Sequence, residues 1–212
     1  MKATRTYRRL LAAIALLTAW PAASQTTTEN DFGIWSSVNV SKQLGGRWEI
    51  YLRGEYRTRD LSRSTNLWFV RPGVSYKPLT WLKLTLSYDF LRKPAIWQHR
   101  AVFDIAATLK SGNLTCTLRE RFIAAYAPHD NEWSWLVRTR ATAKYRIADT
   151  RFAPYLSFEL YANRHWTMMH NFAGVDIDLS HGSSLDVFYM FGLNQSVPRQ
   201  DHILGLGYNL KL

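Results

Sequence analysis

The chain has 212 residues, enough for one domain of ordinary size. After the first 20 residues no stretch approaches the ~18 apolar residues of a membrane-spanning helix, and a single cysteine, Cys116, excludes an intramolecular disulfide. The formal net charge of +11 invites a nucleic-acid partner, but we expect none, because the basic residues alternate with apolar ones instead of clustering.

The first 24 residues have the composition of a secretory signal. Four basic residues within the first nine are followed by an apolar run from Leu10 to Ala19 and then by the small residues 22–24. This run is well short of the ~20 residues that a spanning helix needs. We therefore expect a cleaved signal peptide over 1–24 and a mature domain over 25–212. The mature domain would carry a charge of +7, since four positive charges leave with the signal.

Apolar and polar residues alternate with period two through most of the mature chain. In the segment 48–57, Ile50 and Leu52 share one face while Glu49 and Arg53 share the other, and the segment 81–90 repeats the pattern. Strands of about ten residues cross a bilayer when tilted, whereas strands of soluble sheets are usually shorter. Because lipid offers no partner to an open sheet edge, such strands must close into a barrel.

Eleven segments show strand-like character. They are 32–42, 47–59, 67–77, 81–90, 100–110, 114–125, 133–145, 152–162, 169–179, 184–193 and 201–212. The fold class that they predict is all-β, a transmembrane antiparallel up-and-down β-barrel of 10–12 strands. An even number is usual for a bacterial barrel of one chain, so we expect either that 32–42 folds against the lumen of a ten-stranded barrel or that a twelfth strand exists.

The connections between these segments alternate between tight and longer. Gly45-Gly46, Lys77-Pro78 and the segment 111–113 are typical of tight turns. The intervening connections, such as 60–66 and 91–99, read as longer polar loops. This alternation is typical of outer-membrane barrels, whose short turns face the periplasm.

The last segment also fits an outer-membrane barrel. Leu204, Leu206 and Tyr208 lie on one face of 201–212, and the chain ends on an apolar residue, Leu212. This pattern resembles the C-terminal signal that the bacterial barrel-assembly machinery binds, although the usual last residue there is aromatic. We therefore expect the assembly machinery as a partner through Leu204–Leu212, with outer-membrane lipid and lipopolysaccharide around the barrel.

Several different short motifs are spread along nearly the whole mature chain. They are Asp31-Phe32-Gly33 with Trp35, the segments 54–60, 75–78 and 81–84, His99-Arg100, and the segments 118–122, 154–161 and 202–208. In combination they resemble a family of small outer-membrane β-barrel proteins, known as a domain of unknown function, in Bacteroides-type Gram-negative bacteria. The resemblance implies a barrel in the outer membrane and implies no catalytic residues.

Charged residues occupy the polar face of many segments, which is the face that would point into the barrel. We expect a lumen network in which acidic and basic side chains pair across the lumen. Its members are Glu49, Arg53, Glu55, Arg57, Lys83, Asp89, Arg119, Arg121, Arg138, Arg140, Glu159, Asp176 and Asp178, with Lys144 and Asp186 on the same faces. Pairing is expected because a buried charge without a partner is costly.

Glu120 does not fit this pattern, since its parity places it on the lipid face with Leu118 and Phe122. Two explanations stand side by side at this point. The carboxylate lies near the outer headgroups, where a charge costs little, or a bulge reverses the register.

Two functions follow from these patterns. The favoured one is an outer-membrane barrel of unknown molecular activity, structural or forming a narrow channel, with a salt-bridged lumen. The alternative is a lipid-modifying enzyme of the lipid A deacylase or phospholipase type, in which a rim histidine such as His99 would act with Ser87 or Asp89. No local catalytic motif and no metal-ligand spacing is present, so we expect neither a cofactor nor a metal.

Overall fold

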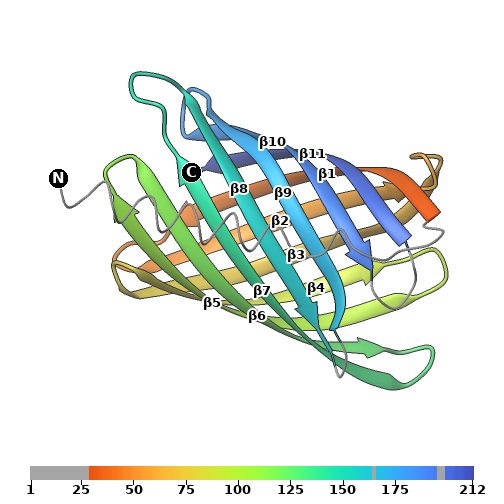
Figure 1. The fold of residues 1–212 in the computed structure, drawn as a ribbon. Helices are drawn as coiled ribbons and strands as arrows, with labels where there is room; N and C mark the ends of the chain where they lie inside the picture. Colours follow the sequence, from red (N-terminus) through yellow and green to blue (C-terminus); the bar gives the residue numbers. More distant parts are fainter. Residues whose placement is uncertain (1–28, 164–165, 195–198) are drawn as a thin grey trace.

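The computed structural model describes residues 29–163, 166–194 and 199–212, and it forms one closed barrel of eleven strands (Figure 1). The strands are β1 (Glu29–Gln43), β2 (Trp48–Arg59), β3 (Ser64–Leu79), β4 (Leu82–Arg92), β5 (Trp97–Ser111), β6 (Leu114–Ala127), β7 (Glu132–Tyr145), β8 (Phe152–Ala162), β9 (Trp166–Asp178), β10 (Ser183–Asn194) and β11 (Arg199–Lys211). The predicted signal peptide lies outside the described residues. Within them, no helix has the length and apolar character needed to span a membrane.

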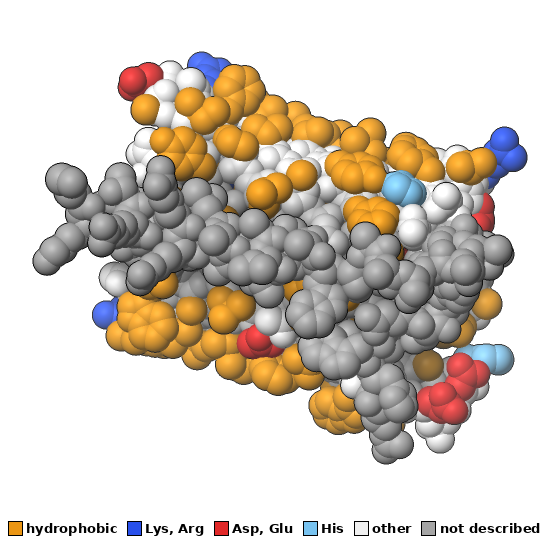
Figure 2. All heavy atoms as spheres, in the orientation of Figure 1, with side chains coloured by type: hydrophobic (Ala, Val, Ile, Leu, Met, Phe, Trp, Pro, Cys, Tyr) orange, Lys and Arg blue, Asp and Glu red, His pale blue; other side chains and the backbone are white. Residues whose placement is uncertain are grey.

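The alternation predicted from the sequence sorts side chains between the lumen and the outer face. On β4, Thr85 and Asp89 are buried inside the barrel, while Leu86 is 58% exposed on the outside. Figure 2 shows hydrophobic side chains over much of the visible outer face, with most charged side chains near the two ends. Compared with a soluble protein, this distribution is inverted, because apolar groups face outward and charges lie within.

The barrel closes between β1 and β11, which run parallel (Figure 1). All other neighbouring strands are antiparallel. The all-β barrel is thus as predicted, and its eleven strands lie within the predicted range of 10–12. The first segment does not fold against the lumen of a ten-stranded barrel, however, and no twelfth strand enters the closed barrel of the described residues. β1 is a full member of the wall, paired with β2 on one side and β11 on the other. An odd number of strands makes a parallel pair unavoidable, because consecutive strands alternate in direction around the barrel.

This parallel seam can be tested by disulfide trapping in a Cys116→Ser background. Ser41 and Lys211 are register partners on the inner face at the strand ends, so cysteines there are expected to form a disulfide in the folded protein. Non-reducing gels before and after oxidation measure it. Lys42 and Lys211 provide the matched control, since they project to opposite faces and are expected to stay unlinked. A ten-stranded barrel with β1 in the lumen would leave both pairs unlinked.

Among the connections that the structure describes in full, the expected contrast between tight and longer ones is not observed, and the predicted loops 163–167 and 194–200 lie partly outside the described residues. β3 and β5 start earlier than the sequence indicated, at Ser64 and Trp97, so the connections there shrink to 60–63 and 93–96. At the other end, the turn 146–151 is longer than either of these. The early parts of these strands lack alternation because they are polar or aromatic, yet their backbone groups still pair with the neighbouring strands.

Glu120 lies on the outer face without any bulge. β6 pairs with β5 and β7 in unbroken register, with Glu120 opposite Ile105 and Thr139. The reversed register is therefore wrong. The carboxylate also lies near the middle of β6 rather than at its end. Thr139 Oγ1 donates a hydrogen bond of 2.9 Å to it.

Candidate functional site

The lumen contains three layers of side chains along the barrel axis. We call the end where β1 begins the N-terminal end and the end where β11 finishes the C-terminal end. Large apolar side chains fill the half next to the N-terminal end, among them Leu91, Val102, Ile123, Met190 and Ile203, each at most 5% exposed. Val102 and Ile123 belong to a cluster on β5 to β7, and Met190 and Ile203 belong to a second cluster on β8 to β11.

The layer next to the C-terminal end is polar and lightly charged. Lys83 Nζ lies 2.6 Å from Glu49 Oε1, and Lys144 Nζ lies 2.7 Å from Asp176 Oδ2. Hydroxyl pairs such as Ser75 with Thr85 connect neighbouring strands there. At the rim, Asp178 at the end of β9 pairs with Arg146 of the turn between β7 and β8, and both side chains are 47% exposed.

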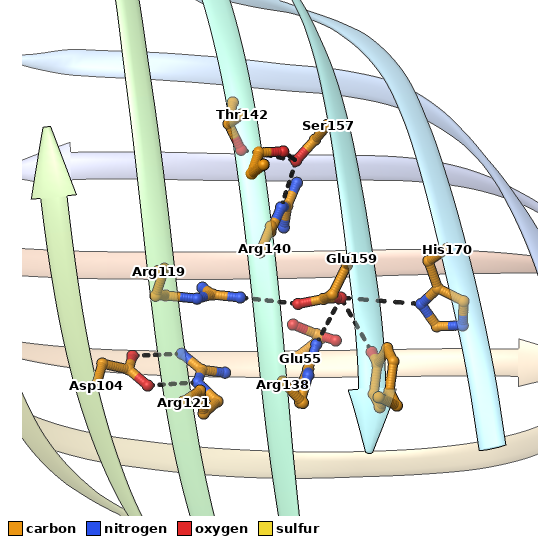
Figure 3. A network of polar contacts seen from close by, with 12 residues as sticks. Glu55, Asp104, Arg119, Arg121, Arg138, Arg140, Thr142, Ser157, Glu159 and His170 are labelled. Carbon is orange, nitrogen blue, oxygen red and sulfur yellow. Dashed lines mark hydrogen bonds and ion pairs between the residues drawn. The ribbon is translucent and has the colours of Figure 1, made fainter. Parts of the chain in front are cut away.

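Between these layers lies an arginine layer centred on Glu159 of β8 (Figure 3). Its side chain is 1% exposed, and both carboxylate oxygens are occupied: Arg119 reaches one oxygen at 2.9 Å and Arg138 the other, also at 2.9 Å. The Tyr161 hydroxyl also donates to Glu159. His170 Nδ1 is 3.9 Å away, which is too long for a hydrogen bond. One carboxylate thus links β6, β7 and β8 inside the barrel.

Three further carboxylates hold five more arginines of this layer. Glu55 accepts from Arg53 and Arg57 on its own strand, at 2.6 and 2.5 Å. Asp89 pairs with Arg71 and Arg100 from the two neighbouring strands. Asp104 receives two hydrogen bonds of 2.6 Å from Arg121 (Figure 3), a bidentate geometry that fixes the guanidinium plane.

The structure therefore places the thirteen residues of the expected lumen network on the inner face, but as several local groups rather than as pairs across the lumen. Their partners lie on the same strand, the next strand or the next but one. Sequence reasoning missed Arg71, Arg100 and Asp104, which hold Asp89 and Arg121. Their parity alone could have identified them, but the inner faces of β3 and β5 mix charged residues with apolar ones such as Phe69 and Val102.

A cavity of about 200 Å³ lies within the arginine layer. Side chains from β1 to β3 and from β5 to β10 line it, so it reaches across the lumen. Its charged lining consists of eight arginines and three carboxylates: Arg53, Arg57, Arg71, Arg100, Arg119, Arg121, Arg138 and Arg140 with Glu55, Glu159 and Asp186. Asp89 and Asp104 pair with three of these arginines from outside the lining. Even with both counted, positive charge is in excess.

Arg140 carries the clearest part of this excess. Its Nε donates to the Ser157 hydroxyl at 2.7 Å (Figure 3), and its guanidinium carbon lies 4.3 Å from the centre of the Phe172 ring. Among the described residues, Arg140 forms no ion pair with a carboxylate. Its charge is therefore balanced by no direct partner, unlike those of the other arginines that line the cavity.

The candidate catalytic residues do not meet. His99 lies on the outer face, where its Nδ1 hydrogen-bonds the Tyr88 hydroxyl and its ring packs beside Phe90. Ser87 and Asp89 are buried on the inner face of β4. His99 on β5 lies opposite Phe90 of β4 and shares its outer face. Since adjacent residues of a strand point to opposite faces, Asp89 and Ser87 lie on the other side of the sheet, and the expected combination with His99 is wrong. In the described part of the chain, no group of three or more potential ligand residues could hold a metal ion.

Comparisons with known proteins add a family and a distant structural likeness. The family model described as "Protein of unknown function (DUF2490)" matches residues 32–202. A solved structure of a KdgM porin aligns with 9% sequence identity and a TM-score of 0.48, over 74% of this chain and 81% of that chain. No curated protein matches the sequence.

Proposed function

This chain belongs to the DUF2490 family, whose function is unknown, and we propose that it is an outer-membrane β-barrel that conducts small anions through a narrow, arginine-lined lumen. The observation that carries the proposal is the excess of arginine over carboxylate around the cavity on the barrel axis. The proposal keeps the salt-bridged lumen expected from the sequence and adds that the lumen prefers negatively charged ions.

The outer face supports the membrane location. Leu52, Leu86 and Leu204 are 49–58% exposed on strands whose inner faces are polar or charged. An exposed apolar surface that surrounds a closed sheet is the arrangement that lipid requires. The expected export signal gives the route, and the exposed Leu204, Leu206 and Tyr208 on β11 support the proposed recognition by the barrel-assembly machinery. Outer-membrane lipid and lipopolysaccharide would then contact this face.

The dimensions favour a narrow path over a wide pore. Barrels of about eight strands are filled by side chains, and barrels of about sixteen leave a wide aqueous channel. Eleven strands lie between these limits. The apolar layer that includes Leu91 and Ile123 would act as a constriction, and the arginine layer beneath it would set the preference for anions.

Planar-bilayer recording of the refolded protein tests this function. Wild-type protein is expected to give small conductance steps, and a KCl gradient should give a reversal potential of the sign that indicates chloride selectivity. Arg140→Glu is expected to lower the anion-to-cation permeability ratio, because it replaces the least compensated positive charge of the lumen by a negative one.

Arg151→Glu is the matched control, since it makes the same change of charge at an exposed position in the turn 146–151. It should leave the permeability ratio nearly unchanged. Cation selectivity in the wild type would contradict the proposal. If no conductance rises above that of the empty bilayer, the channel is refuted and the barrel is a closed, salt-bridged scaffold.

A further inference from the structure

We infer that the arginine layer contains a specific binding site for a small oxyanion, phosphate-like or carboxylate-like, and that Arg140 is the main residue that binds it. This inference rests on the proposed function, because both require a cationic lumen that water and ions can enter. It goes further in one respect. A channel needs only a favourable field, whereas a site needs donors that are left without acceptors.

The acceptors of the arginine layer are already occupied. Glu159 receives Arg119, Arg138 and Tyr161, and Glu55 receives two arginines. The third carboxylate of the lining, Asp186, receives the Tyr155 hydroxyl at 2.9 Å. None of these groups ion-pairs with Arg140. An additional negative charge is therefore the missing component of the layer.

Several donors that line the cavity also lack acceptors. Among the described residues, the buried Trp35 Nε1 and the Nε groups of Arg100, Arg119 and Arg138 have no hydrogen-bond partner. All four are N–H donors. Each of these nitrogens is itself enclosed by protein atoms, and a buried polar group without a partner costs about 1–3 kcal/mol. The walls of the cavity therefore hold donors that small side-chain shifts would bring to a ligand that accepts hydrogen bonds.

Trp35 and Arg140 approach the cavity from different parts of the wall. Trp35 is on β1 beside Arg57, whose guanidinium carbon lies 3.7 Å from the centre of the indole ring. Arg140 is on β7 and is held by Ser157, whose hydroxyl is in turn 2.6 Å from that of Thr142 (Figure 3). The hydroxyl pair orients Nε of Arg140 and leaves the terminal nitrogens of the guanidinium for a ligand.

The cavity limits the size of that ligand. A volume of about 200 Å³ has room for several water molecules, and it lies below the ~300 Å³ at which pockets for drug-sized molecules begin. A small oxyanion fits these limits and can accept several hydrogen bonds at once. The planar fork of a guanidinium matches the oxygen pairs of carboxylate and phosphate groups.

The test uses inorganic phosphate as the probe and the full mature barrel refolded in detergent. Isothermal titration calorimetry in a buffer without other multivalent anions is expected to show saturable binding. Arg140→Gln should weaken the affinity about 10- to 100-fold, the usual effect of losing a charged hydrogen-bond partner. Trp35→Phe, which removes the indole N–H and leaves a smaller aromatic ring, should weaken it about three- to tenfold.

Arg151→Gln removes the same charge from an exposed turn and should bind phosphate as the wild type does. The heat-dependent shift in gel mobility verifies that each variant is folded. Equal affinity in the wild type and in Arg140→Gln would overturn the assigned site. Anion-selective conductance without saturable phosphate binding would overturn the site and leave the channel intact. Binding without conductance would refute the channel and support the site.

Discussion

Replacing Glu159 with glutamine is expected to lower the free energy of unfolding by about 3–5 kcal/mol, the usual cost of removing one partner from a buried ion pair. Glu159 is 1% exposed on its side chain and neutralises Arg119 and Arg138. Glutamine keeps the shape but leaves two guanidinium groups without a counter-charge. Urea titration of the barrel in lipid vesicles, followed by tryptophan fluorescence, measures the change.

Glu49→Gln is the matched control. It removes the same charge from the same face, but Glu49 and its partner Lys83 are 20% and 35% exposed near the C-terminal end. Water screens such a pair, so the expected cost is at most about 1 kcal/mol. Similar losses in the two variants would show that burial of the Glu159 network does not contribute to stability in the way described.

Gly205→Ala is expected to destabilise the barrel by about 1–3 kcal/mol through overpacking. A Cβ at this position would lie 2.0–2.3 Å from three ring carbons of Phe188. That ring cannot move freely, because Trp35 and Phe172 pack against it. Phe188 on β10 thus occupies the space that the glycine leaves on β11, next to the parallel seam. Urea titration or the temperature of unfolding on gels measures the loss.

Gly54→Ala is the control for this substitution. A Cβ at Gly54 would meet no atom within 4 Å, and its φ is not positive. Alanine there is expected to be neutral or to stabilise by up to about 1 kcal/mol, since it reduces the freedom of the unfolded chain. Adding Phe188→Leu to Gly205→Ala should restore part of the lost stability. If both single glycine variants change the stability equally, close packing against Gly205 is not the cause of the loss in Gly205→Ala.

The patterns of residues along the chain were sufficient to predict eleven strands and the face that most of their side chains occupy. This follows from local backbone geometry, since successive side chains of a strand point to opposite faces. Glu49, Arg53 and Glu55 could therefore be placed in the lumen from β2 alone, and Glu120 on the outer face from β6. The match of the family model over residues 32–202 bears out the family resemblance.

Only the tertiary structure decided how the barrel closes and which charges meet. Whether β1 pairs with β11 depends on strands that are far apart in the chain, and periodicity carries no information about such partners. Likewise, Glu159 meets Arg119 two strands away. Arg140 lies opposite Glu159 in the register of β7 and β8 but forms no ion pair, because Arg119 and Arg138 occupy both oxygens of that carboxylate. The sequence by itself determined which face each charge occupies. The stagger and closure of the strands determined its partners, and with them the cavity and its excess of positive charge.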